Sequence, residues 1–253
     1  MIRISNLTKH YGTHAAVDGI DLAVDSGEIF GFLGPNGAGK TTTIKILAGQ
    51  LRPDRGTILI QGHDMAAEPL VCKKITGYIP DRPFLYEKLT GLEFLQFIAS
   101  LYGLDWELFQ RNTVYFLELF DLTAWQHHLI ESYSHGMRQK LMIVSAFMLE
   151  PMLVVVDEPM VGLDPKSAKI VKELFKKHSR KGRTVFLSTH SLEIAEELCD
   201  RIAIIDQGRI RAVGTLDTLR REAELTGSGL EDIFLQLTNA IELGTIIAAL
   251  RQG

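Results

Sequence analysis

The stretch Gly34-Pro35-Asn36-Gly37-Ala38-Gly39-Lys40-Thr41 decides the fold of this chain, because it matches the pattern G-x-x-x-x-G-K-[S/T] in full. An apolar run over residues 28–33 precedes it, and apolar residues at helical spacing follow it at positions 44–48. Glycines let the backbone curl so that its N–H groups converge on phosphate oxygens, and the next helix adds its positive N-terminal dipole. The stretch therefore predicts a strand, a phosphate-binding loop and a helix that together bind a nucleotide.

Two polar side chains of this loop are predicted to bind the nucleotide and its Mg²⁺ ion. Lys40 would reach the β- and γ-phosphates, and the Thr41 hydroxyl would ligate Mg²⁺. A glycine-rich turn before a helix is the alternative, which the strand, loop and helix context disfavours. The predicted nucleotide-binding residues are Gly34, Pro35, Asn36, Gly37, Ala38, Gly39, Lys40, Thr41 and Thr42.

Two later strands end in polar residues suited to nucleotide chemistry. The apolar run Leu153–Val156 would deliver Asp157 to the carboxyl end of a parallel sheet, where a carboxylate can hold Mg²⁺. Glu158 comes next and could polarise a water for attack on the γ-phosphate. His190 follows the predicted strand Thr184–Leu187 and could contact the γ-phosphate or the water, although a cap ahead of a helix explains it as well.

Short apolar runs along the chain predict an α/β protein with a largely parallel sheet. Runs of consecutive apolar residues suit strands that are covered on both faces. From Thr90 to Leu149 the spacing is helical instead, and Thr90 with Glu93 fits a capping box. We therefore expect a helical insertion between an early β-rich part and a later α/β part. Strands are predicted at 2–4, 20–24, 28–33, 57–60, 153–156, 184–187 and 201–205, with a hairpin from 204–206 and 209–213.

The composition excludes several classes of protein. The 253 residues are 46% apolar and 23% charged, which is typical of a globular protein. Lys plus Arg total 27 against 31 Asp plus Glu, and this net charge of -4 leaves no broad basic surface for nucleic acid. Cys72 and Cys199 lie too far apart to suggest a disulfide framework or a zinc site. No secretory signal and no apolar run of the ~20 residues that a membrane helix needs are present, so a partner would have to cross any membrane involved.

A second anion-binding element is predicted at Ser134 and Gly136. Ser134 would cap a helix, and capping alone explains it. Gly136 is a poor helix former in the first turn, and a backbone without a Cβ beside a helix N-terminus suits an anion. Tyr11 could stack on a purine, although a lone aromatic near a strand more often packs.

Taken in order, these motifs resemble the ATP-binding subunits of ABC transporters over almost the whole of residues 1–217. The resemblance implies a P-loop NTPase with a RecA-like α/β core, a small antiparallel β-subdomain and a helical subdomain at about 85–150, followed by a helical tail over 218–253. It makes 34–42 the Walker A loop, 154–158 the Walker B strand, 133–137 the signature, 161–164 the D-loop, His190 the switch histidine and Tyr11 the adenine-stacking residue.

The resemblance also implies an ATPase that binds and hydrolyses Mg-ATP at the interface of a head-to-tail dimer. Ser134 and Gly136 of one chain would complete the site of the other, which is an identical or paralogous ATPase chain. The implied catalytic residues are Lys40, Glu158 and His190, and the implied metal ligands are Thr41, Asp81 and Asp157. The implied partner is a permease subunit on a separate chain, at whose cytoplasmic face the ATPase would sit as a peripheral protein.

The sequence departs from the family pattern at several positions. Asp81 stands in the Q-loop where Gln is usual, and a carboxylate is shorter and cannot donate a hydrogen bond. His135 and Met137 replace Gly and Gln in the signature, and Val161 replaces Ser in the D-loop. The Tyr-Ser-x-Gly-Met signature resembles that of bacterial ABC-2 type exporters. Two alternatives stay open, a soluble ABC ATPase that acts as an assembly factor and a nucleotide-sensing regulator that barely hydrolyses ATP.

Overall fold

A six-stranded sheet forms the centre of the computed structural model, which describes residues 1–222 and 229–238. Adjacent strands in this sheet are parallel, except that β10 runs antiparallel to β9 at one edge. Every residue of β3 and β7 is buried, as their uninterrupted apolar sequences predicted. The strand order is β10 (Arg209–Gly214), β9 (Arg201–Asp206), β3 (Ile29–Leu33), β8 (Thr184–Thr189), β7 (Leu153–Asp157) and β6 (Thr76–Ile79).

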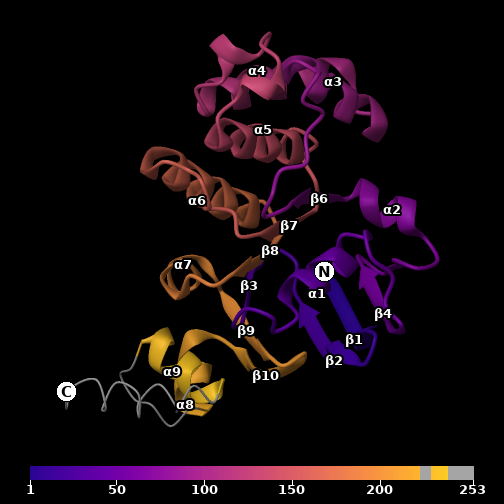
Figure 1. Cartoon of the computed structure of the whole chain (residues 1–253), viewed down its shortest axis with the longest axis vertical. Coiled ribbons are helices and arrows are strands. Elements are labelled where there is room, and N and C mark those ends of the chain that lie inside the picture. Colours follow the sequence, from indigo (N-terminus) through magenta and orange to yellow (C-terminus); the bar gives the residue numbers. More distant parts are fainter. Residues whose placement is uncertain (223–228, 239–253) are drawn as a thin grey trace.

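A smaller antiparallel sheet lies beside the first, with α1 (Lys40–Leu47) packed between the two (Figure 1). One apolar core joins them, because Val17 of the small sheet, Ile44 of α1 and Phe186 of the large sheet belong to a single buried cluster. The helix α2 (Pro69–Lys74) then leads into β6. The order of the small sheet is β2 (His14–Val24), β1 (Ile2–Tyr11), β4 (Arg55–Ile60) and β5 (His63–Asp64).

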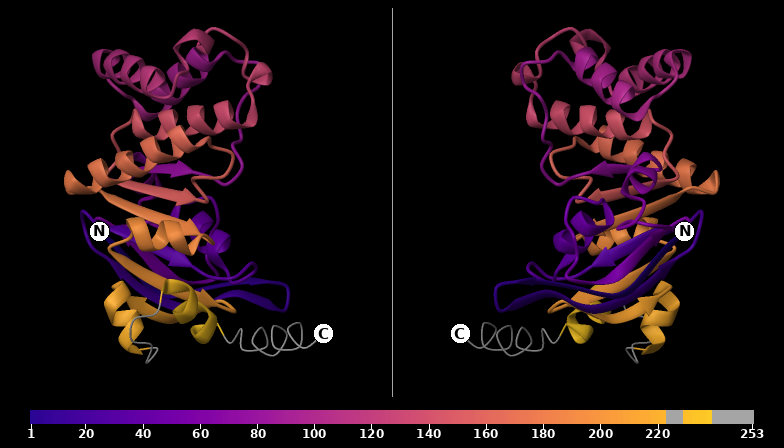
Figure 2. Two further views of the ribbon diagram at one scale, coloured as in Figure 1. Left: turned by 90° about the vertical axis from the view of Figure 1, so that its left-hand side faces the viewer. Right: turned by 90° about the vertical axis from the view of Figure 1, so that its right-hand side faces the viewer.

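Helices form one end of the molecule, as the two side views show (Figure 2). The predicted capping box is confirmed, because the Thr90 hydroxyl accepts from the Glu93 amide at 3.2 Å and the Glu93 carboxylate accepts from the Thr90 amide at 2.8 Å. The helices are α3 (Gly91–Tyr102), α4 (Trp106–Leu119) and α5 (His135–Phe147), with short 3₁₀ turns η1 (Thr123–Trp125) and η2 (Ile130–Ser132) before α5. The longer α6 (Pro165–Arg180) lies between these helices and the large sheet (Figure 1).

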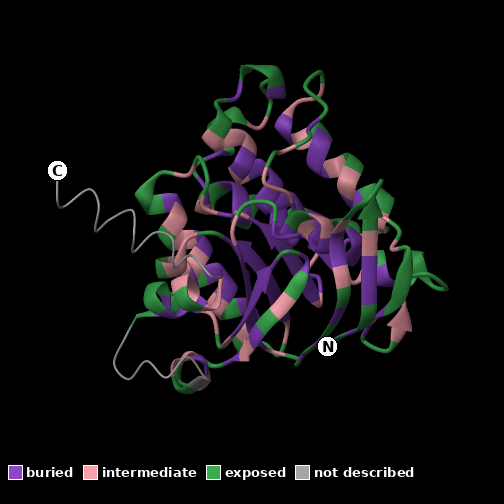
Figure 3. Cartoon of the chain, turned by 60° about the horizontal axis from the view of Figure 1, so that its bottom comes forward, coloured by how far each residue is buried: buried purple, intermediate pink, exposed green. Residues whose placement is uncertain are grey.

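The remaining helices cover the same face of the large sheet as α6, opposite α1, and the strands between are mostly buried (Figure 3). They are α7 (Leu192–Leu198), α8 (Leu216–Glu222) and α9 (Leu230–Leu237). Leu219, Leu230 and Ile233 share an apolar cluster with Ile202 and Ile204 of β9. Residues 223–228 and 239–253 of the predicted helical tail lie outside the described residues, and Gly229 is the N-cap residue of α9. Among the described helices, none combines the length and the apolar character needed to span a membrane.

The structure differs from the predicted strands mainly at their ends and at β6. The strands β1 and β2 extend toward the hairpin at Tyr11, because they pair there through several irregularities of register that no periodicity reveals. The sequence analysis did not identify β6, a four-residue edge strand that contains Gly77. Glycine has low β-propensity, and β6 is held by its parallel pairing with β7 rather than by its own sequence.

Candidate nucleotide site

The loop after β3 is shaped by close approaches that only glycine permits. Gly39 has φ 107°, and a Cβ on it would overlap the carbonyl oxygen of Ala16 in β2. A Cβ on Gly34 would overlap the carbonyl oxygen of Ile205 in β9. No side chain caps α1, so the N–H groups of its first turn are left for another acceptor. The loop is therefore a backbone cradle with the helix N-terminus as one wall, which suits a phosphate.

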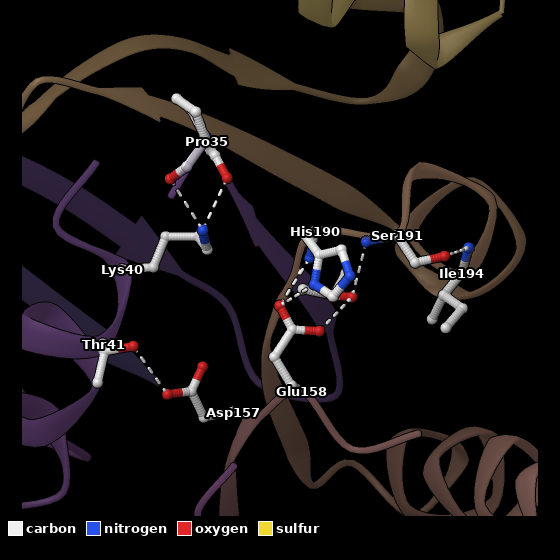
Figure 4. Close-up of polar contacts among 10 residues, drawn as sticks. Pro35, Lys40, Thr41, Asp157, Glu158, His190, Ser191 and Ile194 are labelled. Atoms are coloured by element: carbon white, nitrogen blue, oxygen red, sulfur yellow. Dashed lines mark hydrogen bonds and ion pairs between the residues drawn. The ribbon is translucent and has the colours of Figure 1, made fainter. Parts of the chain in front are cut away.

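Lys40 places a buried positive charge in this cradle (Figure 4). Its Nζ donates to the carbonyl oxygens of Gly34 at 2.7 Å and Pro35 at 3.1 Å. Burial lowers the pKa of Lys40, while the charges of Glu158 and Asp157 oppose that shift. Because its hydrogen bonds go to neutral carbonyls, the ammonium group retains charge that a phosphate could neutralise.

Thr41 and Asp157 meet at the carboxyl end of β7, as the sequence predicted. The Thr41 hydroxyl donates to Asp157 Oδ2 at 3.1 Å, and Asp157 is only 3% exposed. Burial raises the pKa of Asp157, whereas the nearby hydroxyl groups of Ser188 and Thr41 lower it. Asp81 lines the same cavity as Thr41 and Asp157. These three predicted metal ligands are therefore close together.

The set of donors at this point fits Mg²⁺ held jointly by protein and phosphate. A hydroxyl and carboxylates supply the oxygen ligands that Mg²⁺ prefers, and Mg²⁺ usually keeps several waters and substrate phosphates. Among the described residues, no cluster of three or more His, Cys, Asp and Glu side chains could enclose a metal ion.

Glu158 and His190 lie next to each other at the ends of β7 and β8 (Figure 4). Glu158 Oε1 accepts from the His190 backbone N–H at 2.8 Å and lies 2.7 Å from His190 Nδ1. The backbone of Glu158 has φ 50°, in the left-handed region that side-chain-bearing residues seldom adopt. The turn at Glu158 aims its carboxylate toward β8 instead of along β7.

Two hydroxyl groups that the sequence analysis did not single out also face the acidic pair. Thr189 Oγ1 contacts Glu158 Oε2 at 3.1 Å, and the buried Ser188 hydroxyl helps to lower the pKa of Asp157. The signal was present in the sequence, because Ser188 and Thr189 directly precede His190 at the end of an apolar run.

Ser134 and Gly136 lie on a different part of the surface from Lys40. Ser134 caps α5 by accepting from the Met137 amide at 3.3 Å, and a Cβ on Gly136 would lie 2.8 Å from the Gly162 carbonyl oxygen. Figure 1 shows α5 with the helical end of the molecule and α1 beside the small sheet. Within the described residues, no hydrogen bond or ion pair joins the start of α5 to the phosphate loop.

The D-loop residue Asp164 has a structural role at the start of α6. It caps α6 by accepting from the Ser167 amide at 2.9 Å, with Pro165 in the first turn. It also forms an ion pair with Lys140 of α5 at 3.0 Å, which the sequence analysis did not foresee. The start of α5 and the D-loop therefore form one unit within the chain.

Tyr11 lies at the tip of the hairpin between β1 and β2, where it pairs with His14. It is 52% exposed, so its ring is open to a ligand. The same hairpin approaches the phosphate loop at Ala16, beside Gly39. Tyr11 thus belongs to the hairpin that contacts the phosphate loop.

Comparisons with known proteins agree with this geometry. A model of the ABC transporter family matches residues 17–161. The ABC-type transporter ATP-binding protein EcsA of Bacillus subtilis (strain 168) is 35% identical over 238 residues, which are 94% of this chain and 96% of the relative. The linearmycin resistance ATP-binding protein LnrL of the same organism is 38% identical over 241 residues, which are 93% of this chain and 78% of the relative.

A solved structure gives the same result at the level of the fold. It is described as an ATP-binding subunit of an ABC transporter, and it superposes with a TM-score of 0.91 at 39% identity over 94% of this chain and 99% of its own. The fold is therefore that of a P-loop NTPase with the expected β- and helical parts. With Lys40, Thr41, Asp157 and Glu158 gathered at one sheet edge, the chain belongs to the ABC transporter family, as an ATP-binding subunit that hydrolyses ATP with Mg²⁺.

Proposed function

We propose that two copies of this chain, or this chain and a paralogue, bind ATP between them and drive export through a separate membrane subunit. One observation supports the dimer above all. The chain gathers Lys40, Thr41 and Asp157 at one sheet edge. The exposed Ser134 and Gly136 lie apart from them, at the start of α5. A second chain, placed head-to-tail, would bring its own Ser134 and Gly136 to the triphosphate.

In this proposal the residues of the site divide the work of binding Mg-ATP. Residues 34–42, Lys40 among them, bind the phosphates, and Tyr11 stacks on the adenine. Thr41, Asp157 and Asp81 hold Mg²⁺. The ion, when bound, neutralises charge on the β- and γ-phosphate oxygens. Glu158 accepts a proton from the attacking water, and His190 stabilises the charge that develops on the phosphate.

The membrane partner would dock on a row of exposed aromatic rings beside Asp81. Phe84 is 82% exposed, and the Tyr86 ring bridges it to Phe97 with centroid distances of 6.4 Å and 5.4 Å. Contiguous exposed apolar surface of this kind marks an interaction site. We assign residues 1–217 to the ATP-binding domain, with its helical subdomain at about 85–150, and 218–253 to a C-terminal tail, all peripheral at the cytoplasmic face of the membrane.

The word resistance in the name of the LnrL relative supports export as the direction of transport. The signature Tyr133-Ser134-His135-Gly136-Met137 supports the same assignment, because it resembles that of ABC-2 type exporters.

The dimer is tested with Glu158→Gln, which keeps the shape of the side chain and removes its ability to take a proton. We expect this variant to bind Mg-ATP, fail to hydrolyse it and elute as a dimer in size-exclusion chromatography. ATP would bind the closed dimer more tightly than the separate chains, so the dimer would persist for as long as ATP is not hydrolysed. The added substitution Ser134→Ala should weaken that dimer, and monomers at saturating Mg-ATP would contradict the proposal.

A further inference from the structure

Among the described residues, the hydrogen-bond partners of the Glu158 carboxylate are Thr189 and His190, at the end of β8. His190 contacts Oε1 through its backbone N–H and Nδ1, and the Thr189 hydroxyl contacts Oε2 at 3.1 Å. The two side chains differ in their freedom to move. The His190 side chain is 65% exposed, whereas Thr189 is 1% exposed. Thr189 is therefore the fixed side-chain partner of Glu158, and His190 has room to rotate.

The direction of the Thr189 hydrogen bond follows from the groups around it. Thr189 Oγ1 accepts from the Ser191 backbone N–H at 3.0 Å, because an amide can only donate. A hydroxyl group carries one proton, and the amide does not use it. The proton is thus left for Glu158 Oε2, which lies 3.1 Å away. Hydrogen bonds to an ionised acceptor of this kind are stronger than those between neutral groups.

The backbone of Glu158 does not hold this arrangement by itself. Its φ of 50° lies in a sparsely populated region, which persists only where surrounding contacts enforce it. Two backbone hydrogen bonds contribute, from the Glu158 amide to the Ser188 carbonyl oxygen at 3.0 Å and from the Val161 amide to the Glu158 carbonyl oxygen at 3.3 Å. Within the part of the chain that the structure describes, Oε2 has the Thr189 hydroxyl as its hydrogen-bond partner. Loss of that hydroxyl would leave the side chain attached through Oε1 alone.

We propose that Thr189 is a positioning residue for ATP hydrolysis, whose hydroxyl fixes the Glu158 carboxylate whichever way the His190 side chain points. This inference rests on the proposed role of Glu158 as the proton acceptor. A general base must lie within hydrogen-bond reach of the proton that it takes, so a carboxylate held through Oε1 alone would be less well placed and would act more slowly. Thr189 acts through Glu158 and does not touch the nucleotide.

The test compares Thr189→Val, which keeps the branched shape without the hydroxyl, with Thr189→Ser, which keeps the hydroxyl. Steady-state hydrolysis of Mg-ATP by the full chain gives kcat and KM. For Thr189→Val we expect kcat to fall about 10-fold to 100-fold while KM for ATP stays within about twofold. Thr189→Ser should restore most of kcat. Thr189→Ala gives the same comparison if Thr189→Val does not fold, because it also lacks the hydroxyl.

Ser191→Ala is the matched control for disturbance of α7. Ser191 caps this helix by accepting from the Ile194 amide at 3.4 Å, and its side chain does not contact Glu158 (Figure 4). We expect kcat of Ser191→Ala to stay near that of the unmodified chain. An unchanged kcat in Thr189→Val, or a Thr189→Ser variant as slow as Thr189→Val, would overturn the inference.

Glu158→Gln separates failure of this inference from failure of the proposed function. An inactive Glu158→Gln beside a fully active Thr189→Val would remove Thr189 from the account and leave Glu158 as the base. If Glu158→Gln hydrolyses ATP at the normal rate, the role of Glu158 itself is wrong.

Discussion

At the scale of single residues, the site depends on backbone conformation as much as on charge. Lys40 is buried against carbonyl oxygens, and Glu158 turns on a left-handed backbone. The burial of Lys40 and the left-handed turn at Glu158 both depend on backbone groups that are packed closely around them. Gly39 is the clearest case, because it combines φ 107° with contact against β2.

Gly39→Ala is therefore expected to weaken nucleotide binding and lower the melting temperature. The new Cβ would overlap the Ala16 carbonyl oxygen, so the loop or the hairpin must shift. Gly37→Ala is the matched control, since Gly37 also has a positive φ of 81° but open space around its Cβ. We expect at least about a tenfold rise in the Kd of a fluorescent ATP analogue for Gly39→Ala and a clearly smaller one for Gly37→Ala. Equal effects in the two variants would show that overlap with β2 does not matter.

At the scale of elements, helix ends determine where the chain turns. Three helices begin at a residue whose side chain accepts a hydrogen bond from the backbone N–H of the residue three positions later: Ser134, Asp164 and Ser191. These caps lie in the signature, at the end of the D-loop and directly after His190. Thr90 does the same for α3, with the reciprocal contact from Glu93. The start of α5 lies against the D-loop, where Lys140 forms an ion pair with the capping residue Asp164 at 3.0 Å.

Thr90→Ala should lower the free energy of unfolding by about 1 kcal/mol, because it removes the hydroxyl that satisfies an orphan amide of α3. Thr90→Ser keeps the hydroxyl and should change the stability by only a few tenths of a kcal/mol. Urea unfolding followed by circular dichroism measures both variants. The Kd for ATP should stay unchanged, because α3 lies far from the phosphate loop (Figure 1). An unchanged urea midpoint in Thr90→Ala would mean that the capping box adds nothing.

At the scale of the whole molecule, the helical end is joined to the rest through a buried aromatic cluster around α6. His178 of α6 is 5% exposed and meets the Phe147 ring of α5 edge-on, with the centroids 5.4 Å apart. Its Nε2 is buried without a hydrogen-bond partner in the described part of the chain. Burial, with the positive charges of Arg183 and Lys181, lowers the pKa of His178 from 6.5 to about 4.

This shift makes the fold less stable in mild acid. Below pH 6.5 the unfolded chain binds a proton at His178, while the folded chain stays neutral until the pH approaches 4. The unfolded state therefore binds more protons in this range, and stability falls as the pH falls. His178 alone should reduce the free energy of unfolding by about 2 kcal/mol between about pH 8 and about pH 5. Urea midpoints at the two pH values measure the loss.

His178→Phe is the control for this pH dependence, because it keeps an aromatic ring against Phe147 and removes the titrating group. The loss of stability between about pH 8 and about pH 5 should be smaller in this variant by about the same 2 kcal/mol. If both proteins lose stability equally over that range, His178 is not the group responsible.

The sequence by itself determined the parts of this protein that depend on local patterns. The phosphate loop, the buried strands that end at Asp157 and His190, and the caps at Thr90 and Ser134 were all predicted from residues a few positions apart. Backbone conformation, periodicity and capping are properties of neighbours along the chain, so a single sequence contains them. The ends of β1 and β2 and the short β6 were not predictable, because pairing with other strands defines them.

Only the tertiary structure decided which of those parts meet. Thr41 and Asp157 are 116 residues apart in sequence, and Glu158 and Thr189 are 31 apart. Their contacts follow from the strand order, in which β3 lies next to β8 and β8 next to β7. Side-by-side parallel strands bring their carboxyl ends to one edge, whatever the length of chain between them. The order of strands is a property of the packed core as a whole, and no local pattern of residues records it.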